Sequence, residues 1–297
     1  MPVDFGIRLP SFPPEDDTDA NVYYDKTLNA LSEHFTTVWL SDHLQKGASP
    51  FFEGWTRLVY LSAKYTRFKY GHLVLCQSFR NPALLAKMGA TLQYLTGGRF
   101  ILGLGAGWLK EEYDAYGFDF ATPGARVEQL AETIEIIRAM WTQSPVTYHG
   151  KHYHIDNAYC EPRPDPIPPI LVGTNGRRAI SVAARLADGW NWDYAPETFI
   201  PPYRILKEQC EEIGRNPEEV WLTAAGEAHF PEDPADFRVP DLSQALVEPK
   251  LGPTPTDAIE QLRPLVELGV THFQIYFEDH RTLERFCAEV APVLAAL

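Results

Sequence analysis

The sequence predicts one (β/α)8 TIM barrel that spans residues 1–297 as a single domain. Short apolar strand patterns alternate with amphipathic helical patterns from end to end, and they make up eight strand-then-helix units. No long linker, internal repeat or low-complexity tract separates these units. A chain of 297 residues is also an ordinary length for a single barrel.

The first four units fill the N-terminal half of the chain. Strands are expected at 3–9, 37–41, 68–75 and 100–104, and helices follow at 21–33, 54–64, 82–96 and 125–141. Asn81 caps the third helix, and Pro82 takes its first position, where the missing N–H of proline loses no hydrogen bond. Four apolar residues of the fourth helix recur at helical spacing, namely Leu130, Ile134, Ile137 and Trp141.

The last four units and two insertions complete the chain. Strands are expected at 169–172, 189–191, 220–224 and 271–277, with helices at 177–187, 196–213, 257–268 and 282–296. Residues 146–169, after the fourth strand, predict a β-hairpin with a turn at His149-Gly150. Residues 227–253, after the seventh strand, are rich in proline and acidic residues and predict a long irregular loop. A lid over an active site and a solvated excursion both fit this loop.

Composition excludes several classes of protein. The net charge of −14 argues against nucleic acid and against an anionic membrane surface as partners. No apolar run approaches the roughly 20 residues of a membrane span, and the first residues lack the features of a signal peptide. Four scattered cysteines without a CxxC pair predict reduced thiols, as in a cytoplasmic enzyme.

A glycine-spaced turn follows the fourth expected strand. Glycines at 103, 105 and 107 carry no Cβ, so a flat ligand or a phosphate could approach the backbone closely here. The segment does not fit a dinucleotide-binding fingerprint, because Trp108 stands where a third glycine is required. The second strand of that motif is also missing, because residues 127–141 have a helical pattern.

These motifs together resemble the bacterial luciferase-like family, which contains FMN-dependent monooxygenases and coenzyme F420-dependent oxidoreductases. The resemblance extends over nearly the whole chain in the family's order. It is carried by Trp39-Leu40-Ser41-Asp42-His43, Arg80-Asn81-Pro82-Ala83-Leu84-Leu85-Ala86-Lys87, the block from Gly97 to Glu112, Pro169-Ile170-Leu171-Val172-Gly173-Thr174-Asn175-Gly176, Ala187-Asp188-Gly189-Trp190-Asn191 and Leu268-Gly269-Val270-Thr271-His272-Phe273.

The resemblance implies an oxidoreductase that acts on a small organic substrate. The preferred reading is F420-dependent hydride transfer, with F420 slightly ahead of FMN. One alternative is an FMN-dependent monooxygenase that uses O2 and reduced flavin from a partner reductase. Another is a flavin-binding barrel without catalysis. A cytoplasmic homodimer is expected in each case.

Asp42 and His43 end the second strand, which directs them to the mouth of a barrel. Imidazole titrates near neutral pH and can exchange a proton with a cofactor or a substrate. The resemblance implies that His43 lies against the cofactor ring and that both residues are catalytic, with Asp42 orienting His43 or binding the ring edge. The alternative is that Asp42 caps the next segment and His43 only packs.

The loop from Gly173 to Arg178 opens a helix, whose free N–H groups can bind an anion. The resemblance implies that Gly173, Thr174, Asn175, Gly176 and Arg177 bind the cofactor phosphate. A capped Gly-Asn turn is the alternative. The loop follows the fifth strand, whereas barrels more often place phosphate after strands 7 and 8.

Further cofactor contacts come from the resemblance alone. They are expected from Gly105, Ala106, Gly107 and Trp190, and from His72 and Leu73, where a cis peptide bond is expected. Basic residues for the acidic tail of F420 are expected among Lys46, Arg80, Arg177 and Arg178.

Trp108 departs from the family pattern. It replaces a catalytic glutamate of related sugar-phosphate dehydrogenases, which favours a more apolar pocket, and Glu111 and Glu112 are expected to cap or be solvated at the next helix. No metal site is expected, although His149, His152 and His154 cluster in the hairpin.

Overall fold

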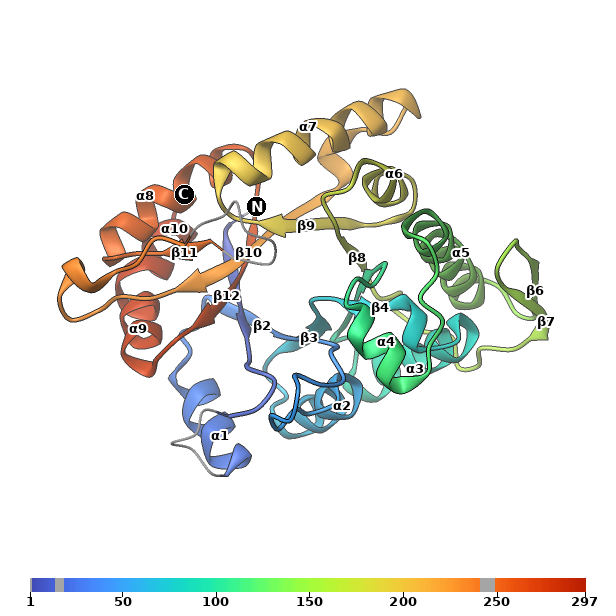
Figure 1. Cartoon of the computed structure of the whole chain (residues 1–297), viewed down its shortest axis with the longest axis horizontal. Coiled ribbons are helices and arrows are strands. Elements are labelled where there is room, and N and C mark those ends of the chain that lie inside the picture. The colour runs from blue at the N-terminus through green and yellow to red at the C-terminus, as the bar shows by residue number, and fades with distance from the viewer. Residues whose placement is uncertain (1, 14–18, 241–248) are drawn as a thin grey trace. The chain divides into compact units, whose positions relative to one another are not determined.

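The computed structural model describes residues 2–13, 19–240 and 249–297. The chain forms two compact units (Figure 1). Unit 1 consists of Met1–Trp39, Asn191–Tyr203 and Trp221–Leu297, and unit 2 consists of Leu40–Trp190 and Arg204–Val220. Strand β2 (Phe35–Leu40), strand β9 (Gly189–Asp193) and helix α7 (Pro196–Glu212) each contain a boundary between the two units.

Unit 1 is built on a parallel sheet with the strand order β11-β10-β12-β1-β2. Its strands are β1 (Asp4–Arg8), β2 (Phe35–Leu40), β10 (Trp221–Ala228), β11 (Lys250–Leu251) and β12 (His272–Phe277). Its helices are α1 (Ala20–Ala30), α8 (Pro255–Glu267), α9 (His280–Arg285) and α10 (Ala291–Ala295), with a π-helical turn at Phe286–Val290.

Successive side chains of a strand point to opposite faces of the sheet, and in unit 1 the two faces carry different kinds of side chain. On one face the Phe5 ring lies 5.6 Å from Phe35 and 5.3 Å from Phe286, and these rings form an apolar core. On the other face, Nδ1 of His272 lies 2.5 Å from Oδ1 of Asp4. Nε2 of His272 accepts a hydrogen bond from Trp39 Nε1 at 3.0 Å. These contacts join β12 to β1 and β2 through polar side chains, of which His272 and Trp39 are buried and Asp4 is partly exposed.

Unit 2 contains four further parallel strands, in which β5 pairs with β3, β4 and β8. These strands are β3 (Lys69–His72), β4 (Leu75–Cys76), β5 (Phe100–Gly105) and β8 (Ile170–Gly173). Its helices are α2 (Gly54–Lys64), α3 (Pro82–Thr96), α4 (Lys110–Tyr116), α5 (Pro123–Thr142) and α6 (Arg177–Leu186). Strands β6 (Val146–His149) and β7 (His154–Ala158) form an antiparallel hairpin.

Most expected elements are present. Helices α2 and α3 have the expected bounds, and Asn81 accepts the N–H groups of Ala83 and Leu84 as the N-cap of α3. The predicted hairpin is confirmed, but its turn lies at residues 150–153 and not at His149-Gly150, because His149 still belongs to β6 and pairs with His154. The predicted loop 227–253 contains the end of β10, a 3-10 turn at Pro234–Asp236 and β11, and its residues 241–248 lie outside the described residues.

Two expectations needed correction, and the last helix contains an irregular turn. Helix α4 was missed, because its seven residues are too few to show a clear helical period. The last helix, expected at 282–296, is helical throughout, with a π-helical turn at Phe286–Val290 between α9 and α10. The third strand is split into β3 and β4, and a cis peptide bond joins Leu73 to Val74 at the break, one bond later than expected.

The break between β3 and β4 explains why residue 103 of β5 is a glycine. A Cβ at Gly103 would lie 1.9 Å from the carbonyl oxygen of His72. Only glycine therefore lets β5 pass this close to the end of β3. Among the described residues, no helix has the length and apolar character that crossing a membrane requires.

Candidate active site

His43 follows strand β2, and a carboxylate from a distant part of the chain holds its ring. Nδ1 of His43 lies 2.8 Å from Oε2 of Glu112 on α4. The Glu112 side chain is 2% exposed, whereas that of His43 is 33% exposed. Because a carboxylate only accepts, Nδ1 carries the proton and the neutral ring keeps a lone pair on Nε2. The ring can therefore take up a proton at Nε2.

Glu112 also fixes the backbone beside His43. Its Oε1 accepts from the N–H of Leu44 and, at 3.3 Å, from the N–H of Gln45. Tyr116, further along α4, donates to the carbonyl of Leu44 at 3.2 Å. The expectation that Glu112 caps or is solvated at its helix was wrong, because its carboxylate is buried and bound to the loop after β2.

Two aromatic rings stand edge-on to His43. The Trp108 ring is 5.6 Å away at 79°, and the Phe51 ring is 6.4 Å away at 88°. Trp108 is 49% exposed, so its indole covers the imidazole and still presents an apolar surface to solvent. The surroundings of His43 therefore combine one carboxylate with two aromatic surfaces.

Asp42 does not orient His43, because its carboxylate is fully engaged elsewhere. Arg80 donates to both of its oxygens, at 2.7 and 2.8 Å, and the N–H of Cys76 donates at 2.9 Å. Arg80 also donates to Glu53 at 2.7 Å, and Glu53 caps α2. This ion-paired cluster joins the ends of β2 and β4 to α2. It also occupies Arg80, which had been expected among the residues for an acidic tail.

The glycine turn after β5 packs against protein atoms. A Cβ at Gly105 would lie 2.5 Å from the Val74 side chain, and one at Gly107 would lie 2.0 Å from the Tyr113 hydroxyl. Gly107 also has a positive φ of 77°. The room left by these glycines is thus filled by the chain itself. Cofactor contacts of Gly105, Ala106 and Gly107 remain a prediction that rests on their backbone atoms.

Cys76 and Tyr113 lie beneath this turn. The Cys76 thiol and the Tyr113 hydroxyl are 3.0 Å apart, and both residues are buried. Burial raises the pKa of each of the two groups. Cys76 therefore stays a thiol near neutral pH and is not prepared as a nucleophile.

The loop before α6 leaves the start of this helix open. Gly176 is its N-cap, and no side chain caps the helix. A Cβ at Gly176 would meet nothing within 4 Å. The loop is held from beneath, since the buried Trp190 donates its indole N–H to the carbonyl of Thr174 at 2.7 Å. Arg177 lies 3.4 Å from Glu208, at the edge of the loop.

His72 is enclosed. Its side chain is fully buried, and its ring stacks on Trp55 of α2 at 5.9 Å and 9°. The imidazole is therefore not placed to contact a ligand, and any contact at this position would come from the backbone. The neighbouring Leu73 is half-buried, and its N–H donates to the carbonyl of Leu40 at 2.8 Å.

We expect His72 to make the protein less stable in acid. Burial lowers the pKa of His72 from 6.5 to about 3. Between these values the unfolded chain binds a proton that the folded chain excludes, so the free energy of unfolding falls as the pH falls below 6.5. The slope from this residue is at most about 1.4 kcal/mol per pH unit.

The variant His72→Phe tests this expectation, because phenylalanine can stack on Trp55 and does not titrate. Thermal unfolding midpoints at pH 7 and pH 5 should differ less for the variant than for the wild type. An equal acid-induced fall in both proteins would contradict the assignment to His72.

The three histidines of the hairpin do not converge on one point. His152 Nε2 lies 2.8 Å from Glu128 of α5, while the rings of His149 and His154 are 5.8 Å apart. Across the described residues, no group of three or more metal-ligating side chains comes together.

The comparisons with known proteins agree with this architecture. A solved F420-dependent secondary alcohol dehydrogenase, in complex with an F420-acetone adduct, matches with a TM-score of 0.81 at 19% identity over 99% of both chains. EDTA monooxygenase from Chelativorans sp. BNC1 matches with a TM-score of 0.79 at 13% identity, over 100% of this chain and 94% of that one. The fold is thus that of the luciferase-like TIM barrels, as predicted.

Sequence comparison gives the family. The model of the luciferase-like monooxygenases matches residues 29–241. The F420-dependent glucose-6-phosphate dehydrogenase of Kineococcus radiotolerans is 28% identical over 91% of this chain and 92% of its own length. The chain belongs to the luciferase-like monooxygenase family, and it is an oxidoreductase of this type. The resemblance drawn from its motifs is confirmed.

Proposed function

We propose that this protein binds F420 and catalyses hydride transfer to or from a small organic substrate. The observation that carries the proposal is the His43–Glu112 pair, in which a buried carboxylate orients a half-exposed imidazole. The sequence relatives and one structural neighbour support F420, since their names describe F420-dependent dehydrogenases.

The residues around α6 fit the phosphate of F420. The helix start has no side-chain cap, and space is open at Gly176. Uncapped N–H groups at a helix start bind anions, and Arg177 adds positive charge beside them. Gly173, Thr174 and Asn175 complete this loop, which Trp190 supports through Thr174. When bound, F420 supplies a deazaflavin ring that exchanges a hydride.

In the proposed reaction, His43 accepts and donates the proton. Its Nε2 accepts a proton from a substrate hydroxyl, or returns one to a carbonyl oxygen in the reverse direction. Glu112 accepts the hydrogen bond from Nδ1–H throughout and stabilises the imidazolium while it exists. Asp42 positions the loop through Arg80 and Cys76 and does not move a proton itself.

The rings around His43 indicate the class of substrate. Trp108 and Phe51 offer apolar edges close to the imidazole. We therefore favour a small, largely apolar alcohol or carbonyl compound over a sugar phosphate. The chain 1–297 would act as one domain, in a cytoplasmic homodimer.

FMN is the second candidate cofactor. Two structural neighbours, EDTA monooxygenase and the monooxygenase RslO1, are named for the reaction class of the FMN alternative. The net charge of −14 also disfavours a cofactor with an acidic tail such as F420. In this alternative, reduced FMN would come from a partner reductase. Titration of the purified protein with F420 and with FMN, followed by absorbance and fluorescence, separates the two. Tight FMN binding without measurable F420 affinity would overturn the F420 proposal.

We expect Gly176→Asp to weaken binding of phosphorylated cofactors at the α6 loop. The added carboxylate would repel the phosphate, while the fold should be kept, because the site is open and aspartate is a good N-cap. Gly176→Asn is the matched control with nearly the same shape and no charge. The effect is measured by the dissociation constants of F420 and a deazaflavin without phosphate, or of FMN and riboflavin, and the phosphorylated form should lose roughly ten-fold more affinity than its phosphate-free form. Equal losses for the two forms would rule out a phosphate site here.

A further inference from the structure

The hairpin of β6 and β7, which lies beside α5 (Figure 1), places His149 directly opposite His154. In the next pair towards the turn, the N–H of Gly150 donates to the carbonyl of Tyr153 at 2.9 Å. Hydrogen-bonded and non-hydrogen-bonded pairs alternate along an antiparallel ladder, so the two histidines form a non-hydrogen-bonded pair, in which side chains lie closest. A turn at His149-Gly150, as expected from the sequence, would not have brought these two residues together.

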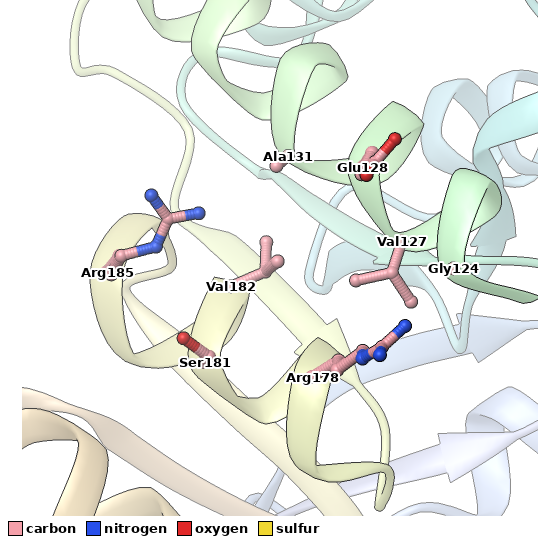
Figure 2. Close-up of a pocket in the computed structure, with 8 residues that line it drawn as sticks. All are labelled: Gly124, Val127, Glu128, Ala131, Arg178, Ser181, Val182 and Arg185. Atoms are coloured by element: carbon pink, nitrogen blue, oxygen red, sulfur yellow. The ribbon is translucent and has the colours of Figure 1, made fainter.

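Helix α5 holds this hairpin in place from one side. The buried carboxylate of Glu132 accepts hydrogen bonds from three consecutive N–H groups of the turn, at 2.7, 3.0 and 2.9 Å. Tyr148 of β6 donates to Glu135 at 2.6 Å. Glu128, which extends away from α6 in Figure 2, lies 2.8 Å from Nε2 of His152. The two strands are therefore fixed before any ligand binds.

The other side of the hairpin presents the histidine pair to solvent. Because side chains alternate along a strand, His149 points away from the side on which Tyr148 contacts α5. His149 and His154 are both exposed. Neither ring is paired with a carboxylate in the portion of the chain that the structure describes. The exposed Asp156, two residues after His154, lies on the same side and adds a negative charge that attracts cations.

We infer that His149 and His154 together bind one divalent transition-metal ion, with water completing its coordination. Imidazole is a favoured ligand of Cu²⁺, Ni²⁺ and Zn²⁺. Two imidazoles that bind one ion at about 2.0 Å have ring centres roughly 4.5–6.4 Å apart, as the N–metal–N angle opens from about 90° to 180°. The ring centres of His149 and His154 are 5.8 Å apart, which lies within this range.

A fixed pair of ligands also favours binding energetically. Once one imidazole holds the ion, the second binds it within the same molecule, so the pair binds more tightly than a single histidine. The contacts with α5 hold the strands in register, which lowers the entropy lost when the second ligand binds. The site would thus join the two strands of the hairpin, apart from the residues that the proposed reaction uses.

The test is a calorimetric titration of the purified protein with Cu²⁺, which nitrogen ligands bind most tightly among these ions. We expect one tight site per chain, with an EPR spectrum that shows two coordinating nitrogen atoms. His149→Gln and His154→Gln should each weaken binding at this site by roughly ten-fold or more. His152→Gln is the matched control, because it removes a histidine of the same hairpin outside the pair, and the affinity should change by less than about two-fold.

Stability provides a second measurement. Both positions of the pair are exposed, so the variants without metal should unfold at the same temperature as the wild type. Saturating Cu²⁺ should raise the unfolding midpoint of the wild type more than that of the double variant His149→Gln, His154→Gln.

Three results would overturn the inference. These are the absence of a tight Cu²⁺ site in the wild type, unchanged affinity in either variant of the pair, and an equal loss of affinity in His152→Gln. None of them bears on the proposed F420 chemistry, which does not involve the hairpin.

Discussion

Replacing His43 with alanine is expected to lower kcat by roughly 10²–10⁴-fold, which is the usual contribution of a general acid or base. The half-exposed imidazole contributes little to packing, so the cofactor dissociation constant should change much less than kcat. Steady-state kinetics with the accepted cofactor, together with a binding titration, measure both quantities. Circular dichroism of the variant establishes that the fold is retained.

His34→Ala is the matched control for this experiment. His34 is partly exposed directly before strand β2 and has no role in the proposed site, so its loss should leave kcat within about two-fold of the wild type. If His43→Ala lowers binding and turnover by the same factor, the imidazole packs against the cofactor and does not transfer a proton.

The order of strands and helices could be read from the sequence because each element carries its own local pattern. The helix at Pro82–Thr96, for example, has a capping asparagine and a proline at its first position, and both signals lie within a few residues. The short α4 has no comparable signal over its seven residues.

Local sequence patterns could not identify Glu112 as the partner of His43. Asp42 adjoins His43 in the sequence, which made it the natural candidate, yet the two side chains serve different networks. The carboxylate that orients the ring lies 69 residues further along the chain. The burial of Glu112 points to a partner, since a carboxylate is rarely enclosed without one, but this burial is seen only in the structure.

The glycines of the turn after β5 were recognised by their missing Cβ atoms, which were expected to leave space for a ligand. In the structure, Val74 and Tyr113 take up that space at Gly105 and Gly107. A sequence shows that a side chain is absent, but which atom approaches in its place depends on contacts between distant segments.

Replacing Glu112 with glutamine should lower kcat by roughly 10- to 1,000-fold, less than the loss of His43 itself. Glutamine has nearly the same shape, and its carbonyl oxygen can still accept from the N–H groups of Leu44 and Gln45. Its amide then faces Nδ1 of His43 as a donor, which moves the ring proton to Nε2. The neutral imidazole can no longer accept a proton at the nitrogen that faces the substrate.

Two measurements separate this positioning role from a structural one. The ¹⁵N chemical shifts of His43 should show protonation at Nδ1 in the wild type and at Nε2 in Glu112→Gln, with similar unfolding midpoints. The double variant His43→Ala, Glu112→Gln should be no slower than His43→Ala alone, because a residue that acts through the imidazole contributes nothing without it. Additive losses in the double variant, or an unchanged tautomer, would show that Glu112 serves the fold of the loop and not the chemistry of His43.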